Sequence, residues 1–224
     1  MKLTSEYVLN RMKLSSDEER AEAKEQLELR GAFQYNRIVD LLVDNGLEPS
    51  YDTASALYRY DKRLRFNLYK YISMLEEYLR AIIGNYYDSR DTEPNISFNN
   101  KSDKYPKIEE FKYVGEYLKE ITLGALVIIA KDNKEAFDGI YNIDSESFDS
   151  DMDAIKVFRD KIDHQAFLQT AELSECIKYG DKTLKSNLLN LRDYLPESYK
   201  VSLTDKINKC VKGLNLPEEL KIII

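Results

Sequence analysis

The sequence predicts an all-α protein, a helical bundle folded as a single domain. Apolar residues recur at helical spacings of three, four and seven over long stretches. Glycine and proline, which interrupt helices, number only eight and five in 224 residues, and no succession of short alternating strands is found. Hydrophobic residues make up 43% of the chain, which is enough to bury one sizeable core.

Three helices are expected in the N-terminal half of the chain. A capping box, Ser16-x-x-Glu19, opens the first of them, which runs to Gly31. The second covers residues 33–44. The third covers residues 51–87, because its leucines and isoleucines form one continuous stripe. A helix of that length is expected to span the whole domain.

The remaining elements follow from the same signals. Two polar stretches, 88–106 and 144–153, are expected to be loops; the second, which is acidic, could also contact a basic partner such as a neutralising protein. Thr122 is expected to cap a short apolar helix. Helices are expected, in chain order, over residues 108–119, 123–132, 152–170, 184–191 and 201–211.

Composition and charge exclude several classes of protein. The formal net charge of −7 argues against a general nucleic-acid coat protein. An enzyme that handles RNA in a local basic groove remains compatible with it, and that groove would be formed by Arg59, Lys62, Arg63 and Arg65. No apolar stretch is long enough to cross a membrane, and the N-terminus has no signal-peptide core. A cytoplasmic protein without a membrane partner is therefore expected.

Metal and cofactor chemistry is not expected. The chain has one histidine and two scattered cysteines, too few for a zinc site. Cys176 and Cys210 are interpreted as structural thiols. There is no glycine-rich phosphate loop, and the histidine lacks the motif partners of a hydrolase triad or a metalloenzyme.

The single histidine, His164, lies five residues after Arg159 on a segment with an apolar stripe. Histidine can exchange a proton near neutral pH, and arginine can hold a phosphate with its planar fork, so the pair is suited to cleaving RNA without a metal. Five residues correspond to about 140° around a helix, so the two side chains do not share a face. They would converge if the helix ended between them, or across a two-fold dimer. A polar residue packed at the edge of the core is the simpler alternative for His164.

Three segments resemble the Abi-like abortive-infection family of bacterial phage-defence proteins. The first, LYRYDKRLRFNLYKYISMLEEYLRAII, matches the family's pattern at Tyr58, Asp61, Leu64, Arg65, Glu76 and Arg80. The second is EITLGALVII. The third, VFRDKIDHQAF, is similar to the Arg-Asn-x-x-x-His signature of HEPN domains. With the closing segment GLNLPEEL, the resemblance covers residues 57–220.

The resemblance implies a fold, an activity and a site. It implies a HEPN-like four-helix core with additional helices over residues 51–213, preceded by a helical extension over 1–50 and followed by a tail over 214–224. It implies a homodimeric, metal-independent endoribonuclease that arrests growth on phage infection. Arg159 and His164 match the catalytic pair, and the members of the supporting polar pair are Glu76 and Arg80.

The chain departs from the family pattern beside the catalytic pair. Asp160 stands where asparagine is usual, and a carboxylate there would repel phosphate or pair with Arg159. Asp163 adds a second negative charge next to His164; it could orient the ring or weaken RNA binding. The alternative is therefore a catalytically inactive HEPN-fold module that binds RNA or protein. A plain helical scaffold that serves for dimerisation is a third reading.

Overall fold

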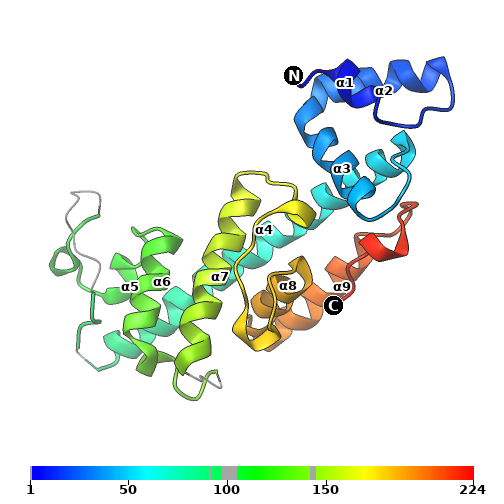
Figure 1. Cartoon of the computed structure of the whole chain (residues 1–224). Coiled ribbons are helices and arrows are strands. Elements are labelled where there is room, and N and C mark those ends of the chain that lie inside the picture. Colours follow the sequence, from blue (N-terminus) through cyan, green and yellow to red (C-terminus); the bar gives the residue numbers. More distant parts are fainter. Residues whose placement is uncertain (1, 91, 97–104, 142–144) are drawn as a thin grey trace. The chain divides into compact units, whose positions relative to one another are not determined.

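The computed structural model describes residues 2–90, 92–96, 105–141 and 145–224, and helices dominate it (Figure 1). Within these residues no strand forms, and extended segments meet only at isolated bridges. The predicted all-α helical bundle is confirmed. None of the helices in the described ranges is both long and apolar enough to cross a membrane. The helices group into two compact units, each of which is described by itself.

The first unit combines the N-terminal helices with later parts of the chain. It comprises Met1–Asn67, Gln165–Ala171 and Asp205–Ile223. Its helices are α1 (Ser5–Leu9), α2 (Asp17–Arg30), α3 (Ala32–Asp44) and the first part of α4 (Tyr51–Asp88), with short 3-10 turns η3 (Leu168–Thr170) and η5 (Glu218–Leu220). Helices α1, α2 and α3 pack against one another. Their buried side chains include Val8, Leu9, Leu27, Tyr35, Ile38 and Leu42.

The predicted start of α2 is confirmed in atomic detail. The Ser16 hydroxyl accepts a hydrogen bond from the Glu19 N–H at 3.1 Å, and the Glu19 carboxylate accepts the N–H of Ser15. The first contact satisfies a backbone donor that the first turn of a helix leaves unpaired, and the second ties the Glu19 side chain to the residue before the cap. Gly31 then separates α2 from α3 with a φ of 93°, a conformation that a residue with a side chain rarely adopts.

The second unit carries the predicted catalytic residues. It comprises Leu68–His164 and Glu172–Thr204, together with Ile224. Its helices are the rest of α4, α5 (Val114–Tyr117), α6 (Leu123–Asp132), α7 (Ser145–Asp163), α8 (Leu184–Asp193) and the first part of α9 (Glu197–Lys209), with 3-10 turns η1 (Ile108–Glu110), η2 (Lys134–Phe137) and η4 (Ile177–Tyr179). Helices α6 and α8 both pack on α7. The core includes Leu75, Leu79, Ile83, Leu126, Phe137, Phe148, Phe158 and Leu188.

One predicted loop is wrong. Most of the acidic stretch 144–153 forms the first turns of α7 instead of a solvated loop; residues 142–144 lie outside the described part. Phe148 and Met152 are fully buried one turn apart and give this stretch an apolar face. Acidic residues are also favourable near a helix N-terminus, where the dipole is positive. The acidic composition therefore indicated a helix start.

Two predicted helices have different bounds in the structure. The segment 108–119 forms only η1 and the four-residue α5. The helix predicted over 152–170 ends at Asp163, because Gln165 adopts a left-handed φ of 54°. Of the predicted loop 88–106, residue 88 still belongs to α4, and the described residues 92–96 are not helical. Residues 91 and 97–104 lie outside the described part.

Candidate functional site

Arg159 lies in the last turns of α7, directly after the buried Phe158. The apolar side of α7 packs in the core, so the next residue along the chain is carried to the edge of the buried surface. The Arg159 side chain is 36% exposed. A guanidinium in this position can reach a ligand in solvent while its helix is fixed by the core.

Two carboxylates on the same helix hold the guanidinium of Arg159. Its Nη1 forms an ion pair with the Asp163 carboxylate at 2.7 Å and donates a hydrogen bond to the Asp160 carboxylate at 3.3 Å. Among the described residues these are its charged partners. The pairing that the sequence raised as an alternative is therefore present, and an RNA phosphate would compete with both carboxylates for this side chain.

His164 is the first residue after α7, and it is exposed. The backbone N–H of His164 donates to the Asp160 carbonyl at 3.0 Å, so the helical path of the backbone continues through this residue. The chain leaves that path only at Gln165. The end of the helix therefore comes too late to bring His164 onto the face of Arg159 within one chain.

Glu76 and Arg80, the supporting pair of the resemblance, form an anchor between α4 and the α5–α6 connection. Arg80 Nη2 bonds the Glu76 carboxylate at 2.7 Å, as an i,i+4 pair. Its Nε donates to the Leu118 carbonyl at 2.7 Å, and Nη2 also donates to the Ile121 carbonyl at 3.1 Å. The pair therefore does more than stabilise the helix surface, because it fixes the backbone that leads into α6.

The four basic residues predicted to line an RNA groove belong to the first unit, and three of them have hydrogen-bond partners. Arg59 Nε donates to the Ser55 carbonyl at 3.3 Å within α4. Arg65 Nε bonds the buried Asp61 carboxylate at 2.7 Å. Arg63 Nη1 donates to the carbonyls of Cys210 at 3.0 Å and Lys212 at 2.8 Å, just past the end of α9. Arg59 and Lys62 are exposed.

The cysteines are unsuited to nucleophilic chemistry. Both are buried and free. Burial raises the pKa of the Cys176 thiol to about 12 and also raises that of Cys210. A thiol that stays protonated at neutral pH is a poor nucleophile. The interpretation as structural thiols fits these environments.

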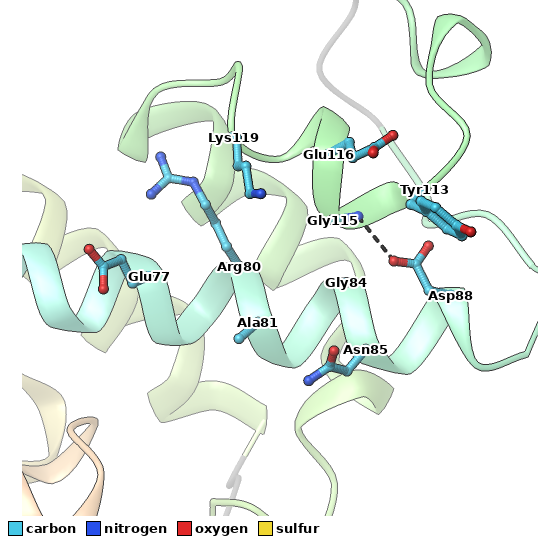
Figure 2. Close-up of a pocket in the computed structure, with 10 residues that line it drawn as sticks. All are labelled: Glu77, Arg80, Ala81, Gly84, Asn85, Asp88, Tyr113, Gly115, Glu116 and Lys119. Carbon is cyan, nitrogen blue, oxygen red and sulfur yellow. Dashed lines mark hydrogen bonds between the residues drawn. The ribbon is translucent and has the colours of Figure 1, made fainter.

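Sequence reasoning missed a groove between α4 and α5. Its cavity volume is about 580 Å³, and Figure 2 shows its lining residues: Glu77, Arg80, Ala81, Gly84, Asn85, Asp88, Tyr113, Gly115, Glu116 and Lys119. The Asp88 carboxylate accepts the N–H of Val114 at 2.7 Å and that of Gly115 at 3.3 Å. The start of α5 is therefore held on α4 by a residue of α4 itself.

Two glycines face each other where α5 approaches α4. A Cβ atom added at Gly84 would lie 3.0 Å from the Cα of Gly115 and 3.3 Å from its nitrogen. A Cβ atom at Gly115 would meet only the Asp88 carboxylate, at 3.4 Å, so the steric requirement for glycine lies at position 84. The sequence signal was the pair of small residues, Ala81 and Gly84, on one side of α4, but no spacing rule connected them to Gly115.

Replacing Gly84 with alanine is expected to destabilise the protein by up to about 2 kcal/mol. Overpacking against a backbone costs about 1–3 kcal/mol, and the better helix propensity of alanine returns only about 1 kcal/mol. Urea unfolding measures the change. Gly124→Ala in α6 is the matched control, because its Cβ would meet only side-chain atoms at ordinary contact distances, the flexible end of Lys156 at 3.4 Å and the Thr122 hydroxyl at 3.8 Å. An equal gain in stability from both variants would contradict the close approach.

The chain was compared with models of known protein families, with curated proteins and with solved structures, and no match was found in any of the three.

Proposed function

We propose that the protein is a metal-independent endoribonuclease of the HEPN type that acts in phage defence by abortive infection. The observation that carries the proposal is that Arg159, which is partly exposed, and His164, which is exposed, lie at the C-terminal end of one core-anchored helix and directly after it. An anion-binding side chain and a proton-transfer side chain are thereby offered to solvent from one rigid element. The resemblance of VFRDKIDHQAF to the HEPN signature adds to this.

The proposed reaction is an attack within the RNA chain. His164 removes the proton of a ribose 2′-hydroxyl, and the oxygen forms a bond to the adjacent phosphorus. The bond from phosphorus to the 5′-oxygen breaks, and that oxygen takes up a proton from a second histidine. The products are a 2′,3′-cyclic phosphate and a 5′-hydroxyl. Arg159 offsets the charge that develops on the phosphate.

The reaction is proposed to require a homodimer. One chain contains a single histidine, whereas the base and the acid are two groups. Within one chain, Arg159 and His164 lie on different faces of the helical path, because the hydrogen bond from the His164 backbone N–H to the Asp160 carbonyl keeps His164 on that path. A two-fold axis near the end of α7 would place two copies of each residue in a shared cleft.

The experiment that tests this function is incubation of cellular RNA with the purified protein in EDTA. We expect cuts that carry 2′,3′-cyclic phosphate ends, which would establish cleavage and metal independence together. Cuts that appear only when Mg²⁺ is restored would contradict the proposed chemistry. RNA that binds but stays intact, under conditions in which the protein is dimeric, would favour the second function described next.

A catalytically inactive module that binds RNA or protein is the second candidate. It is favoured by the contacts of Arg159 with Asp160 and Asp163, which balance its charge. The net charge of −7 favours the protein-binding form of this module, since it weakens the general attraction for RNA. A stable complex without any cleavage product is its expected signature.

A further inference from the structure

The exposed side of α4 forms a low ridge between two hollows. Glu77, Ala81 and Asn85 are exposed at successive turns, and they define what we call the α4 ridge. Both Ala81 and Asn85 line the groove against α5 and also a second cavity of about 620 Å³ on the other flank. The ridge is low at its middle because Ala81 carries only a methyl group (Figure 2).

The second cavity offers apolar surface beside the ridge. Its wall opposite α4 is built from η2 and the residues that follow it, including Ala136 and Ile140. Ile140 is 44% exposed. On the other flank the Tyr113 ring is 47% exposed at the edge of the first groove. Each hollow can therefore take an apolar side chain.

Several charged side chains around the ridge already form contacts within the protein. Arg80 is held by Glu76 and by two carbonyls, as described above. The Arg90 guanidinium lies 3.8 Å from the centre of the Tyr86 ring and donates to the Tyr86 carbonyl at 3.0 Å. Asp88 caps α5, and Glu135 accepts the hydroxyl of Tyr87 at 2.5 Å.

The charges that remain for a partner are mostly negative. Glu77, Glu116 and Asp138 are exposed, and within the described residues none of them forms an ion pair. Lys119 and Arg90 are the exposed cations beside them that likewise form no ion pair in that part of the chain. Asp88 and Glu135 also keep their negative charge, so five acids and two cations without an ion pair line the hollows and leave a net charge of −3. RNA would be repelled from this surface and a basic polypeptide would be attracted.

We propose that the α4 ridge and its two hollows form a docking site for a basic, amphipathic segment of a partner protein. Apolar side chains of that segment fill the hollows beside Ala81, and its lysines or arginines face Glu77, Glu116 and Asp138. The small side chain at Ala81 lets the segment lie close to α4, as in packed helices. This site does not depend on the proposed nuclease activity.

The test uses a short synthetic peptide with lysine and leucine at helical spacing, labelled for fluorescence anisotropy with the full-length protein. We expect binding at physiological salt, and none by a peptide with glutamate in place of lysine. The double variant Glu77→Gln/Glu116→Gln should weaken binding about fivefold, given the modest energy of exposed charge pairs. The control Glu25→Gln/Glu28→Gln removes the same charge from exposed positions of α2 and should change binding less than about twofold.

A steric variant locates the site. Ala81→Arg places a long cation on the ridge at an exposed helical position, where arginine is well tolerated, so we expect a folded protein that no longer binds the peptide. Unchanged peptide binding by Ala81→Arg would overturn the proposal, and so would displacement of the peptide by single-stranded RNA. Self-association that Ala81→Arg abolishes, without peptide binding, would assign the surface to a second copy of the chain and also overturn it. Loss of RNA cleavage in the His164→Ala variant tests the proposed nuclease separately.

Discussion

RNA cleavage by the His164→Ala variant is expected to be about 10²–10⁴-fold slower than cleavage by the wild type in EDTA, because a positioned acid or base contributes a rate factor of that size. His164 is the sole histidine, so no other side chain of this type can replace it. In the proposed dimer the substitution removes both the base and the acid. The initial rate on a labelled single-stranded RNA measures the effect.

Exposure of His164 makes this variant a clean test. The side chain lies outside the core, so the melting temperature should stay within about 1–2 °C of the wild type, as is usual for surface substitutions. Glu172→Ala changes another exposed residue of the same unit and serves as the control, with an unchanged rate. Equal cleavage by all three proteins would remove His164 from the mechanism and indicate a contaminating nuclease.

Local sequence signals predicted the helix starts well. Ser16 opens α2 and Thr122 opens α6, and in both cases the side-chain oxygen accepts a backbone N–H three residues later. Such contacts lie within a few residues of one another, so the sequence contains all the information they need. The stripe of α4 was predictable for the same reason.

Helix ends that depend on contacts between residues far apart in the sequence were not predicted. The start of α5 is capped by Asp88, which lies 26 residues earlier in the chain. The segment after α7 leaves the helical path, and the N–H of Leu168 is then bonded by Asp61, 107 residues away. No local pattern can predict a cap that comes from another element. The helix expected over 108–119 was therefore too long, and the one expected over 152–170 ran seven residues past the observed end of α7 at Asp163.

The candidate residues could be chosen from the sequence, but the side chains that surround them could not be predicted from it. The sequence identified Arg159 and His164, and it raised the pairing of Arg159 with an acid as an alternative. Only the structure shows that the Arg159 guanidinium contacts both Asp163 and Asp160. The groove between α4 and α5 could not be predicted either, because it depends on the approach of Gly84 and Gly115, which only tertiary packing determines.

Replacing Asp61 with alanine is expected to lower the free energy of unfolding of the first unit by about 3–5 kcal/mol, the usual cost of removing one partner of a buried ion pair. Asp61 is 1% exposed. Its carboxylate accepts the Leu168 N–H at 2.7 Å and pairs with Arg65 at 2.7 Å. Alanine would leave a buried N–H and a largely buried guanidinium without their acceptor. Urea unfolding at pH 7 measures the loss.

The pH dependence of this loss distinguishes burial from simple charge pairing. Burial raises the pKa of Asp61 above its ordinary value, although Arg65 and the Leu168 N–H act in the opposite direction. When folding raises the pKa of a carboxyl group, the group adds to the free energy of unfolding at low pH. This contribution is complete below the pKa in the unfolded state and is lost as the pH rises through the pKa in the folded state. The deficit of Asp61→Ala should therefore be at least as large at pH 5 as at pH 7, since the neutral acid still accepts the Leu168 N–H. A deficit that shrinks on acidification would mean that ionic attraction to Arg65 outweighs burial.

The exposed neighbour Lys62→Ala is the control and should change stability by less than about 0.5 kcal/mol at either pH.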